Sequence, residues 1–444
     1  MSALAVLGGR PLLDGQIDES GWPLVEDSDV EAVVATLRSG RLSWIDDTEV
    51  PALEREWASY VGTSDCMALN SGTAALHAAV AAAGVGPGDE VLVPALSFLA
   101  SATSVLHHQG IPVFVDVDPE TFTIDPDDME ARITDRTRAV VVVHLHGLPA
   151  DIDRVIEVAR RHELVVIEDA AQAHGAEIDG RRAGGLGDIG AFSIMAGKNL
   201  PTAGEGGLLT TDRPELRERA EMLKMFGERV GAGGRREHHA LTLGWNYRLS
   251  SVLAAFARSQ LSRLDRHTAT VRENAAHLST TLADLPGVWP PIEPDGRRHV
   301  YHHYRLRLDP DEAGLDLPVG VFRRAIQDAV TAEGVTLTEY QNRPLPGQVL
   351  FQRREGYGRG CPWTCGHAGR EITYQAEDYP RTLDVIRSSL LVGRRLCMAS
   401  LLRRENAEQV ADVFTKVFSH LDEVRDHAMT LDYQDPWLQE TRLW

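Results

Sequence analysis

The sequence predicts an α/β protein whose central, mostly parallel sheet is covered by helices on both faces. Between about residues 30 and 255, short apolar runs rich in β-branched residues alternate with amphipathic helical stretches. The runs are apolar almost throughout, which is typical of strands buried on both faces, and helices between such strands favour parallel pairing. Ligands of these sheets bind beyond the carboxyl ends of the strands, so residues there are the candidates for function.

Six strands and three helices are expected in this region. The strands are EVLVPAL (90–96), PVFVDV (112–117), AVVVVHLH (139–146), LVVIEDA (164–170), AFSIM (191–195) and GLLTT (207–211). The helices are TAALHAAVAAAG (73–84), DIDRVIEVARRH (151–162) and ELRERAEMLKMFG (215–227). Together they define a predicted large domain over residues 26–255, which an N-terminal arm over residues 1–25 precedes.

The pattern changes after residue 255, and a smaller α+β domain is expected over residues 256–444. A long helix is expected at 250–285, a strand at 300–309 and an amphipathic helix at 406–424. The stretch 340–380 is rich in Gly, Pro, Arg and aromatic residues without clear periodicity, and it is expected to form a loop-rich insertion.

Charge and composition exclude several classes of partner. The 444 residues include 45 Lys and Arg against 65 Asp and Glu, a net charge of −20, whereas nucleic acids and anionic membranes attract basic surfaces. No apolar run is long enough to span a membrane, and the start lacks the basic region of a signal peptide. The four cysteines of so long a chain fit a reducing, cytoplasmic environment. Cys361 and Cys365, in CPWTC, are interpreted as free thiols in a loop, and no metal site is predicted.

Lys198 lies in a glycine-rich segment, FSIMAGKNLPTAGEGG, directly after a predicted strand. It is one of three lysines in a chain where nearly all other basic residues are arginine, and arginine cannot form a Schiff base. Lys224 and Lys416 fall on predicted helices, where we expect solvated positions. Taken alone, Lys198 is equally consistent with a catalytic amine and with an ordinary loop lysine.

Two further segments bear on this choice. LVVIEDAAQAHGA ends a strand in Glu168 and Asp169, of which only one should face a ligand because successive strand residues point to opposite faces. LNSGTAALHAAV leads through Ser71-Gly72-Thr73 into a helix, and a helix N-terminus favours phosphate binding. Alone, the acids could cap a turn and the serine could be an ordinary N-cap. Pyridoxal phosphate (PLP) requires all three features: a lysine, a carboxylate beside its ring nitrogen and a phosphate site.

Together these segments resemble the DegT/StrS family of PLP-dependent sugar and aminocyclitol aminotransferases, which are fold type I PLP enzymes. The resemblance covers about residues 25–425 and is strongest from Leu69 to Asp265. The matching motifs are NSGTAALHAA, DEVLVPALSFLASA, PVFVDVD, VHLHG, EDAAQAHGA, FSIMAGKNLPTAGEGG and GWNYRLSSVLAA. In this order and spacing they are highly specific.

The resemblance implies a role for each residue that would meet the cofactor ring. Lys198 looks like the Schiff-base lysine, and Asp169 like the acid that pairs with the ring nitrogen. Gln172 is similar to the glutamine that hydrogen-bonds the ring hydroxyl oxygen. Phe98 is similar to the aromatic residue that stacks on the ring, although without the family it would be interpreted as a core aromatic.

The resemblance also implies a phosphate site and a shared active site. Gly72 and Thr73 match the phosphate-binding turn, and Ser193 matches a serine that adds a hydroxyl there. Asn246 matches an asparagine that reaches the phosphate in the neighbouring subunit, which implies a homodimer. Arg248 follows as a candidate for binding a substrate carboxylate or for a structural salt bridge.

The substrate side shows one match and three departures. The match is His303, which lies where family members have a histidine or aromatic residue near the substrate. His146, in VHLHG, replaces a commoner aromatic residue, and Met195 and Ala196 lie in a variable segment. The insertion at 340–380 has no family counterpart that can be matched, so the identity of the acceptor stays open.

The implied activity is transfer of an amino group from glutamate or glutamine to a keto sugar or ketocyclitol in secondary-metabolite biosynthesis. Another PLP reaction, either elimination or amination of a non-sugar carbonyl, is the nearest alternative. A non-catalytic regulatory protein of the same fold would be expected to lack Lys198 or Asp169, and both are present. A dinucleotide-dependent oxidoreductase would carry a GxGxxG fingerprint, which the chain lacks.

Overall fold

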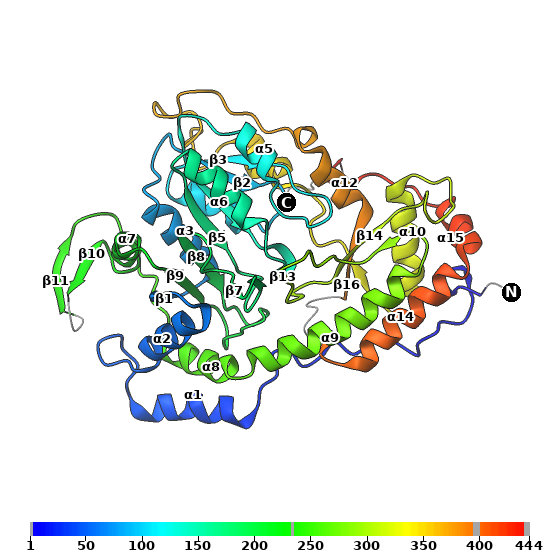
Figure 1. Ribbon diagram of the computed structural model, residues 1–444, viewed down its shortest axis with the longest axis horizontal. Helices are drawn as coiled ribbons and strands as arrows, with labels where there is room; N and C mark the ends of the chain where they lie inside the picture. The colour runs from blue at the N-terminus through cyan, green and yellow to red at the C-terminus, as the bar shows by residue number, and fades with distance from the viewer. Residues whose placement is uncertain (1–2, 232–234, 394–399, 439–444) are drawn as a thin grey trace.

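A seven-stranded sheet forms the centre of the computed structural model, which describes residues 3–231, 235–393 and 400–438. The strands run in the order β1-β9-β8-β5-β4-β2-β3 (Figure 1). Their bounds are β1 (Asp65–Leu69), β2 (Glu90–Pro94), β3 (Ile111–Val115), β4 (Thr137–Val143), β5 (Val165–Asp169), β8 (Ile189–Ser193) and β9 (Gly207–Thr211). Pairing is parallel from β3 to β8. β9 runs antiparallel to both of its neighbours, β8 and β1, so β1 has the same direction as the parallel strands. The predicted mostly parallel sheet is confirmed.

The strands are buried on both faces, which explains their continuous apolar runs. In β2, Val91 and Val93 belong to the core on one face, whereas Leu92 belongs to the core on the other. The first face is covered by α3 (Gly72–Ala82), α4 (Ala100–His107) and α7 (Pro214–Lys224), and the second by α5 (Pro126–Ala131) and α6 (Ile152–Arg161). The sheet therefore forms the middle of three layers.

Several shorter elements surround this sheet. They are η1 (Ala5–Leu7), α1 (Asp27–Ser39), α2 (Glu49–Val61), η2 (Leu145–Gly147), β6 (Glu177–Ile178), β7 (Arg181–Arg182), β10 (Glu228–Gly231), β11 (Arg235–Ala240) and β13 (Arg297–Arg298). β13, β6 and β7 form a small antiparallel sheet, and β10 pairs with β11.

A second, four-stranded antiparallel sheet lies to the right of the main sheet in Figure 1, where β14 and β16 are labelled. Its order is β12 (Val288–Trp289), β14 (Arg305–Leu308), β16 (Ser389–Val392) and β15 (Leu337–Thr338). A separate apolar core joins it to α9 (Leu264–Ala283), α10 (Val319–Ala332), α14 (Arg404–Phe418) and α15 (Leu421–Ala428). The last elements are α12 (Pro380–Ser388) and η6 (Pro436–Leu438).

Three expectations for this half need correction. The long helix is two helices, α8 (Ser251–Leu261) and α9, and the turn between them carries Arg263, which pairs with buried Asp29 at 2.7 Å. The strand expected at 300–309 is confined to β14, because residues before it bond to the 146–147 turn instead. The helix at 406–424 is likewise divided, into α14 and α15.

The insertion at 340–380 is mostly loop, with η4 (Leu345–Gly347), α11 (Val349–Arg353) and η5 (Ala376–Asp378) as its helical turns. It packs against the β3 edge of the main sheet. Tyr374 Oη donates to Pro112 O at 2.8 Å, and the rings of Phe351 and Phe114 meet at 4.9 Å. An edge strand that could pair with another chain is thereby covered.

The two helix lysines are paired rather than solvated, contrary to expectation. Lys224 lies 3.2 Å from Glu54, and its side chain is 13% exposed. Lys416 lies 2.6 Å from fully buried Glu333, whose carboxylate also accepts the amides of Ala5 and Leu12 in the N-terminal arm. Within the described residues, no helix has both the length and the apolarity needed to cross a membrane.

Candidate active site

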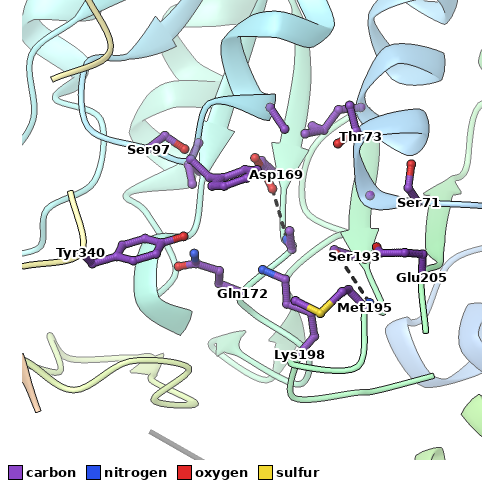
Figure 2. Close-up of a pocket in the computed structure, with 16 residues that line it drawn as sticks. Ser71, Thr73, Ser97, Asp169, Gln172, Ser193, Met195, Lys198, Glu205 and Tyr340 are labelled. Carbon is purple, nitrogen blue, oxygen red and sulfur yellow. Dashed lines mark hydrogen bonds between the residues drawn. The ribbon is translucent and has the colours of Figure 1, made fainter. Parts of the chain in front are cut away.

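A cavity of about 310 Å³ opens at the carboxyl ends of the central strands. It is lined by residues that follow β1, β2, β5 and β8, together with one residue from the insertion. These residues are Ser71, Gly72, Thr73, Leu76, Ser97, Phe98, Ala100, Val143, Asp169, Ala171, Gln172, Ser193, Met195, Lys198, Glu205 and Tyr340. Seven of the ten predicted site residues are therefore brought together in one place (Figure 2).

Lys198 is held in a tight turn after β8, with its side chain directed into the cavity (Figure 2). Its amide donates to Met195 O at 2.8 Å, and its carbonyl accepts from the indole Nε1 of Trp22 at 3.2 Å. The glycines here permit close packing: a Cβ at Gly206 would lie 2.7 Å from Ile194, and one at Gly207 would lie 2.2 Å from Ser71 O.

Burial lowers the pKa of the Lys198 amine below its ordinary value, while Asp169 and Glu205 oppose this shift. A lowered pKa increases the neutral, nucleophilic fraction at physiological pH. The environment of Lys198 is thus that of a reactive amine rather than a solvated loop lysine.

The two acids at the end of β5 point to opposite faces, as strand alternation predicts. Asp169 faces the cavity, where it accepts hydrogen bonds from Ser101 Oγ at 2.7 Å and from Ala171 N at 3.2 Å. Burial raises the pKa of its carboxyl group. Glu168 lies on the other face, where it accepts the amides of the 184–187 turn and contacts His144.

The predicted phosphate turn is formed at the N-terminus of α3. Ser71 is the N-cap and accepts from Ala74 N at 3.0 Å. A Cβ at Gly72 would lie only 2.6 Å from Ser193 Cβ, so glycine is required for this approach. The amides of Gly72 and Thr73 lack intrahelical acceptors, as in the first turn of any helix. The serine hydroxyls and these amides line one end of the cavity.

Gln172 and Phe98 both line the cavity. Gln172 is buried, and its Oε1 accepts from His146 N at 2.7 Å, so its Nε2 is the group left to donate into the cavity. Phe98 lines the cavity with 58% of its surface exposed, so it is not the core aromatic that was the alternative interpretation.

Asn246 and Arg248 lie outside this cavity. Arg248 Nε donates to Asn246 Oδ1 at 2.9 Å, and its guanidinium lies over the rings of Trp44 and Phe226. Arg248 borders a separate pocket that also contains Lys224. Their suggested roles toward a partner or a substrate stay predictions.

His303 lies behind the cavity wall rather than in it. It is buried, its ring lies 4.9 Å from Tyr340 and 5.4 Å from His146, and burial together with Lys198 and Arg305 lowers its pKa to about 3. His146 is also buried and has φ +60°. Both histidines are neutral at physiological pH.

Several lining residues were not predicted. Ser97 and Ser101 are spaced by four in an otherwise apolar segment, and their hydroxyls lie 2.7 Å apart in a chain that ends on Asp169. That spacing was a usable signal. Tyr340 and Glu205 had none, because each reaches the cavity only through the folding of its loop.

Comparisons with known proteins agree with this geometry. Residues 23–375 match the model of the DegT/DnrJ/EryC1/StrS aminotransferase family. The L-glutamine:2-deoxy-scyllo-inosose aminotransferase of Streptoalloteichus tenebrarius is 40% identical over 426 residues, which are 91% of this chain and 95% of that protein. The L-glutamine:scyllo-inosose aminotransferase of Streptomyces griseus is 40% identical over 79% of this chain and 83% of its own length.

A solved structure extends the comparison to the fold. DesV of S. venezuelae is 32% identical, with a TM-score of 0.74 over 91% of this chain and 95% of that chain. The family match, over residues 23–375, includes the whole central sheet and every residue that lines the cavity. The chain is an aminotransferase and belongs to the DegT/DnrJ/EryC1/StrS family.

Proposed function

We propose that this protein uses PLP to transfer the amino group of L-glutamine or L-glutamate to a keto cyclitol or keto sugar. The observation that carries the proposal is a buried lysine, Lys198, which shares one cavity with a buried carboxylate and a helix N-terminus. The relatives named as glutamine:inosose aminotransferases make L-glutamine and a keto cyclitol the first pair to test.

The residues present fit PLP. The α3 N-terminus, with Gly72 packed against Ser193, is a cradle that a Cβ would fill, and its free amides suit a phosphate. Asp169 is a buried carboxylate that no cationic side chain of the described residues contacts by a hydrogen bond, and it suits a protonated ring nitrogen. When bound, PLP supplies an electrophilic carbonyl carbon and a ring that accepts electrons.

Lys198 would have two roles. Its neutral amine would hold the cofactor, and once released it would take the proton from the donor's α-carbon in the first half-reaction and return a proton to the acceptor's carbon in the second. Burial favours the neutral form by lowering the amine pKa, and the nearby Asp169 and Glu205 carboxylates then stabilise the ammonium that forms.

Three further side chains would orient the ring. Asp169, which accepts hydrogen bonds from Ser101 Oγ and Ala171 N, would pair with the protonated ring nitrogen. Gln172 Nε2 would donate to the ring hydroxyl oxygen, because Oε1 already accepts from His146 N. Phe98, which is exposed at the cavity, would pack on the ring.

A homodimer would complete the site. Asn246 lies outside its own chain's cavity and is held by Arg248 Nε. Asn246 is therefore held in place by the Arg248 guanidinium at a position away from its own chain's cavity. From there its side chain is suited to contact the phosphate in the neighbouring subunit. Mixing Asn246→Asp and Lys198→Ala subunits should restore up to about a quarter of the activity if this is correct, since one heterodimer site would be intact.

The activity test is direct. The protein is incubated with PLP, L-glutamine and either scyllo-inosose or 2-deoxy-scyllo-inosose, and the aminated product is sought by mass spectrometry. We expect product with at least one acceptor and none with Lys198→Ala. Cofactor binding without product from any keto cyclitol or keto sugar would contradict the proposed substrate class.

A further inference from the structure

The wall of the cavity opposite the phosphate end is built from the C-terminal half of the chain. Figure 2 shows Tyr340 on the side away from Ser71 and Thr73, with its hydroxyl directed into the cavity. The rings of His303 and His146 lie behind it, at 4.9 Å and 6.3 Å.

Arg305 lies directly behind these rings. Its side chain is 3% exposed, and its Nη1 contacts His146 Nε2 at 3.2 Å and Gln341 Oε1 at 3.1 Å. His146 N also donates to Gln172, and Gln341 follows Tyr340 in the chain. Arg305 therefore contacts the immediate neighbours of two residues that line the cavity, Gln172 and Tyr340.

All partners of Arg305 are neutral. Its Nε donates to Ser389 Oγ at 2.8 Å, and its guanidinium lies 5.3 Å from the ring centre of Phe122. Among the described residues, no carboxylate forms an ion pair with Arg305, whose hydrogen-bond partners are Ser389, His146 and Gln341. Burying a charge without a counter-ion is costly, so its presence here requires an explanation.

A neighbouring arginine shows how unusual this is. Arg307 lies two residues along the same strand, and its Nη2 lies 2.7 Å from the carboxylate of Asp384. Arg323, which is fully buried, is likewise paired, at 2.7 Å from Glu339. Among these three arginines, only Arg305 lacks an acid, and it is the one beside the cavity.

An unpartnered donor beside Arg305 points the same way. Because Arg305 donates to His146 Nε2, the proton of that neutral ring lies on Nδ1, which is buried and has no hydrogen-bond partner among the described residues. A carboxylate oxygen next to this wall would accept from this donor and balance the charge of Arg305.

We propose that Arg305, with His146, His303 and Tyr340, forms the subsite that recognises the α-carboxylate of the amino donor. The inference rests on the proposed function and adds the part of the site that selects the donor. The Tyr340 hydroxyl donates to the carboxylate, and Arg305 supplies the compensating charge from behind. The cyclitol acceptor carries no carboxylate, so this charge discriminates between the two substrates.

The test compares L-glutamine with L-glutaminamide, in which a neutral amide replaces the α-carboxylate. For wild-type protein we expect kcat/KM for L-glutamine to exceed that for the amide by at least ~30-fold. Arg305→Met should bring this ratio close to one, because kcat/KM for L-glutamine falls while kcat/KM for the amide stays the same. Arg305→Lys should restore part of the ratio. Arg307→Met is the matched control, and its ratio should equal that of the wild type.

Binding without turnover separates this inference from the proposed function. Glutaramate, which is L-glutamine without its amino group, is titrated into the PLP-loaded protein by calorimetry. We expect Arg305→Met to weaken its binding by at least ~10-fold and Arg307→Met to leave it unchanged. If glutaramate binding depends on Arg305 but the protein transfers no amino group, the subsite is upheld and the proposed function is rejected. Equal losses in both variants, or equal losses for L-glutamine and its amide, would overturn the inference.

Discussion

The two ends of the cavity are built in different ways. At the proposed phosphate and ring end, Gly72 and Lys198 follow strands of one sheet and Asp169 ends another, and they meet because parallel strands bring their carboxyl ends to one edge. At the opposite wall, His146, Arg305 and Tyr340 come from three distant segments and meet through side-chain contacts. The first end suits the proposed cofactor, and the second suits the proposed amino donor.

The largest effect that bears on this comparison is expected from Asp169→Asn. An amide cannot balance a protonated ring nitrogen, so kcat should fall by about 10²–10³-fold. Since burial raises the pKa of Asp169, its charged form costs folding free energy at pH 7.5, and cofactor-free Asp169→Asn should unfold at an equal or higher urea concentration. A loss of activity that is accompanied by lower stability would indicate a structural role instead.

Gly72→Ala should weaken PLP binding by about 10–100-fold, because its Cβ would lie 2.6 Å from Ser193 Cβ in the phosphate cradle. Gly86→Ala is the control, since a Cβ there meets nothing closer than 3.9 Å. Spectral titration with PLP measures both variants. Equal affinities for the two would show that the α3 N-terminus does not bind the phosphate.

The opposite wall should be sensitive to acid. Burial and the charges of Lys198 and Arg305 lower the pKa of His303 from 6.5 to about 3, so the unfolded chain binds a proton that the folded chain excludes between these values. The contribution of neutral His303 to the free energy of unfolding is therefore fully present above pH 6.5. It is lost as the pH drops toward 3, and the loss is on the order of 2 kcal/mol at pH 5.

Urea unfolding at pH 7.5 and pH 5 measures this dependence. His303→Gln should lose less stability between the two pH values than the wild type does, and His277→Gln, a half-buried position of α9, should behave as the wild type. Identical pH dependence in all three proteins would mean that His303 titrates normally in the fold.

The smallest effect is expected from Tyr340→Phe. Removing the Tyr340 hydroxyl, which is proposed to bind the donor carboxylate, should raise KM for L-glutamine by about 3–10-fold and leave PLP affinity unchanged. Tyr357→Phe, in the same insertion but with its hydroxyl on Leu106 O, is the control and should match the wild type. A weakened PLP affinity in Tyr340→Phe would contradict the assignment of Tyr340 to donor binding alone.

The sequence allowed prediction of the phosphate and ring end because local signals mark it. Apolar strands locate the sheet edge, and the residues after β1, β5 and β8 fall there by topology. The opposite wall has no such signal. Arg305 sits in a strand whose alternation shows only that it is polar, and its lack of an acid depends on where the chain folds.

Errors in predicting the fold had the same origin. The strand expected at 300–309 begins only at Arg305, because Val300 and His303 bond to the 146–147 turn across the molecule. Lys224 and Lys416 were expected in solvent from their helical setting, yet each meets a carboxylate from another element. Periodicity reports which element forms, and it does not report the long-range partner.

Lys198 offers the most direct test of the proposed chemistry. The protein is loaded with PLP, treated with borohydride, digested and mapped by mass spectrometry, with Lys198→Ala as the control. We expect the cofactor to be fixed to the peptide that contains Lys198, and prior addition of L-glutamine to abolish the labelling as the cofactor accepts the amino group. Labelling at Lys224 or Lys416, or none that depends on Lys198, would contradict the assignment of Lys198 as the catalytic amine.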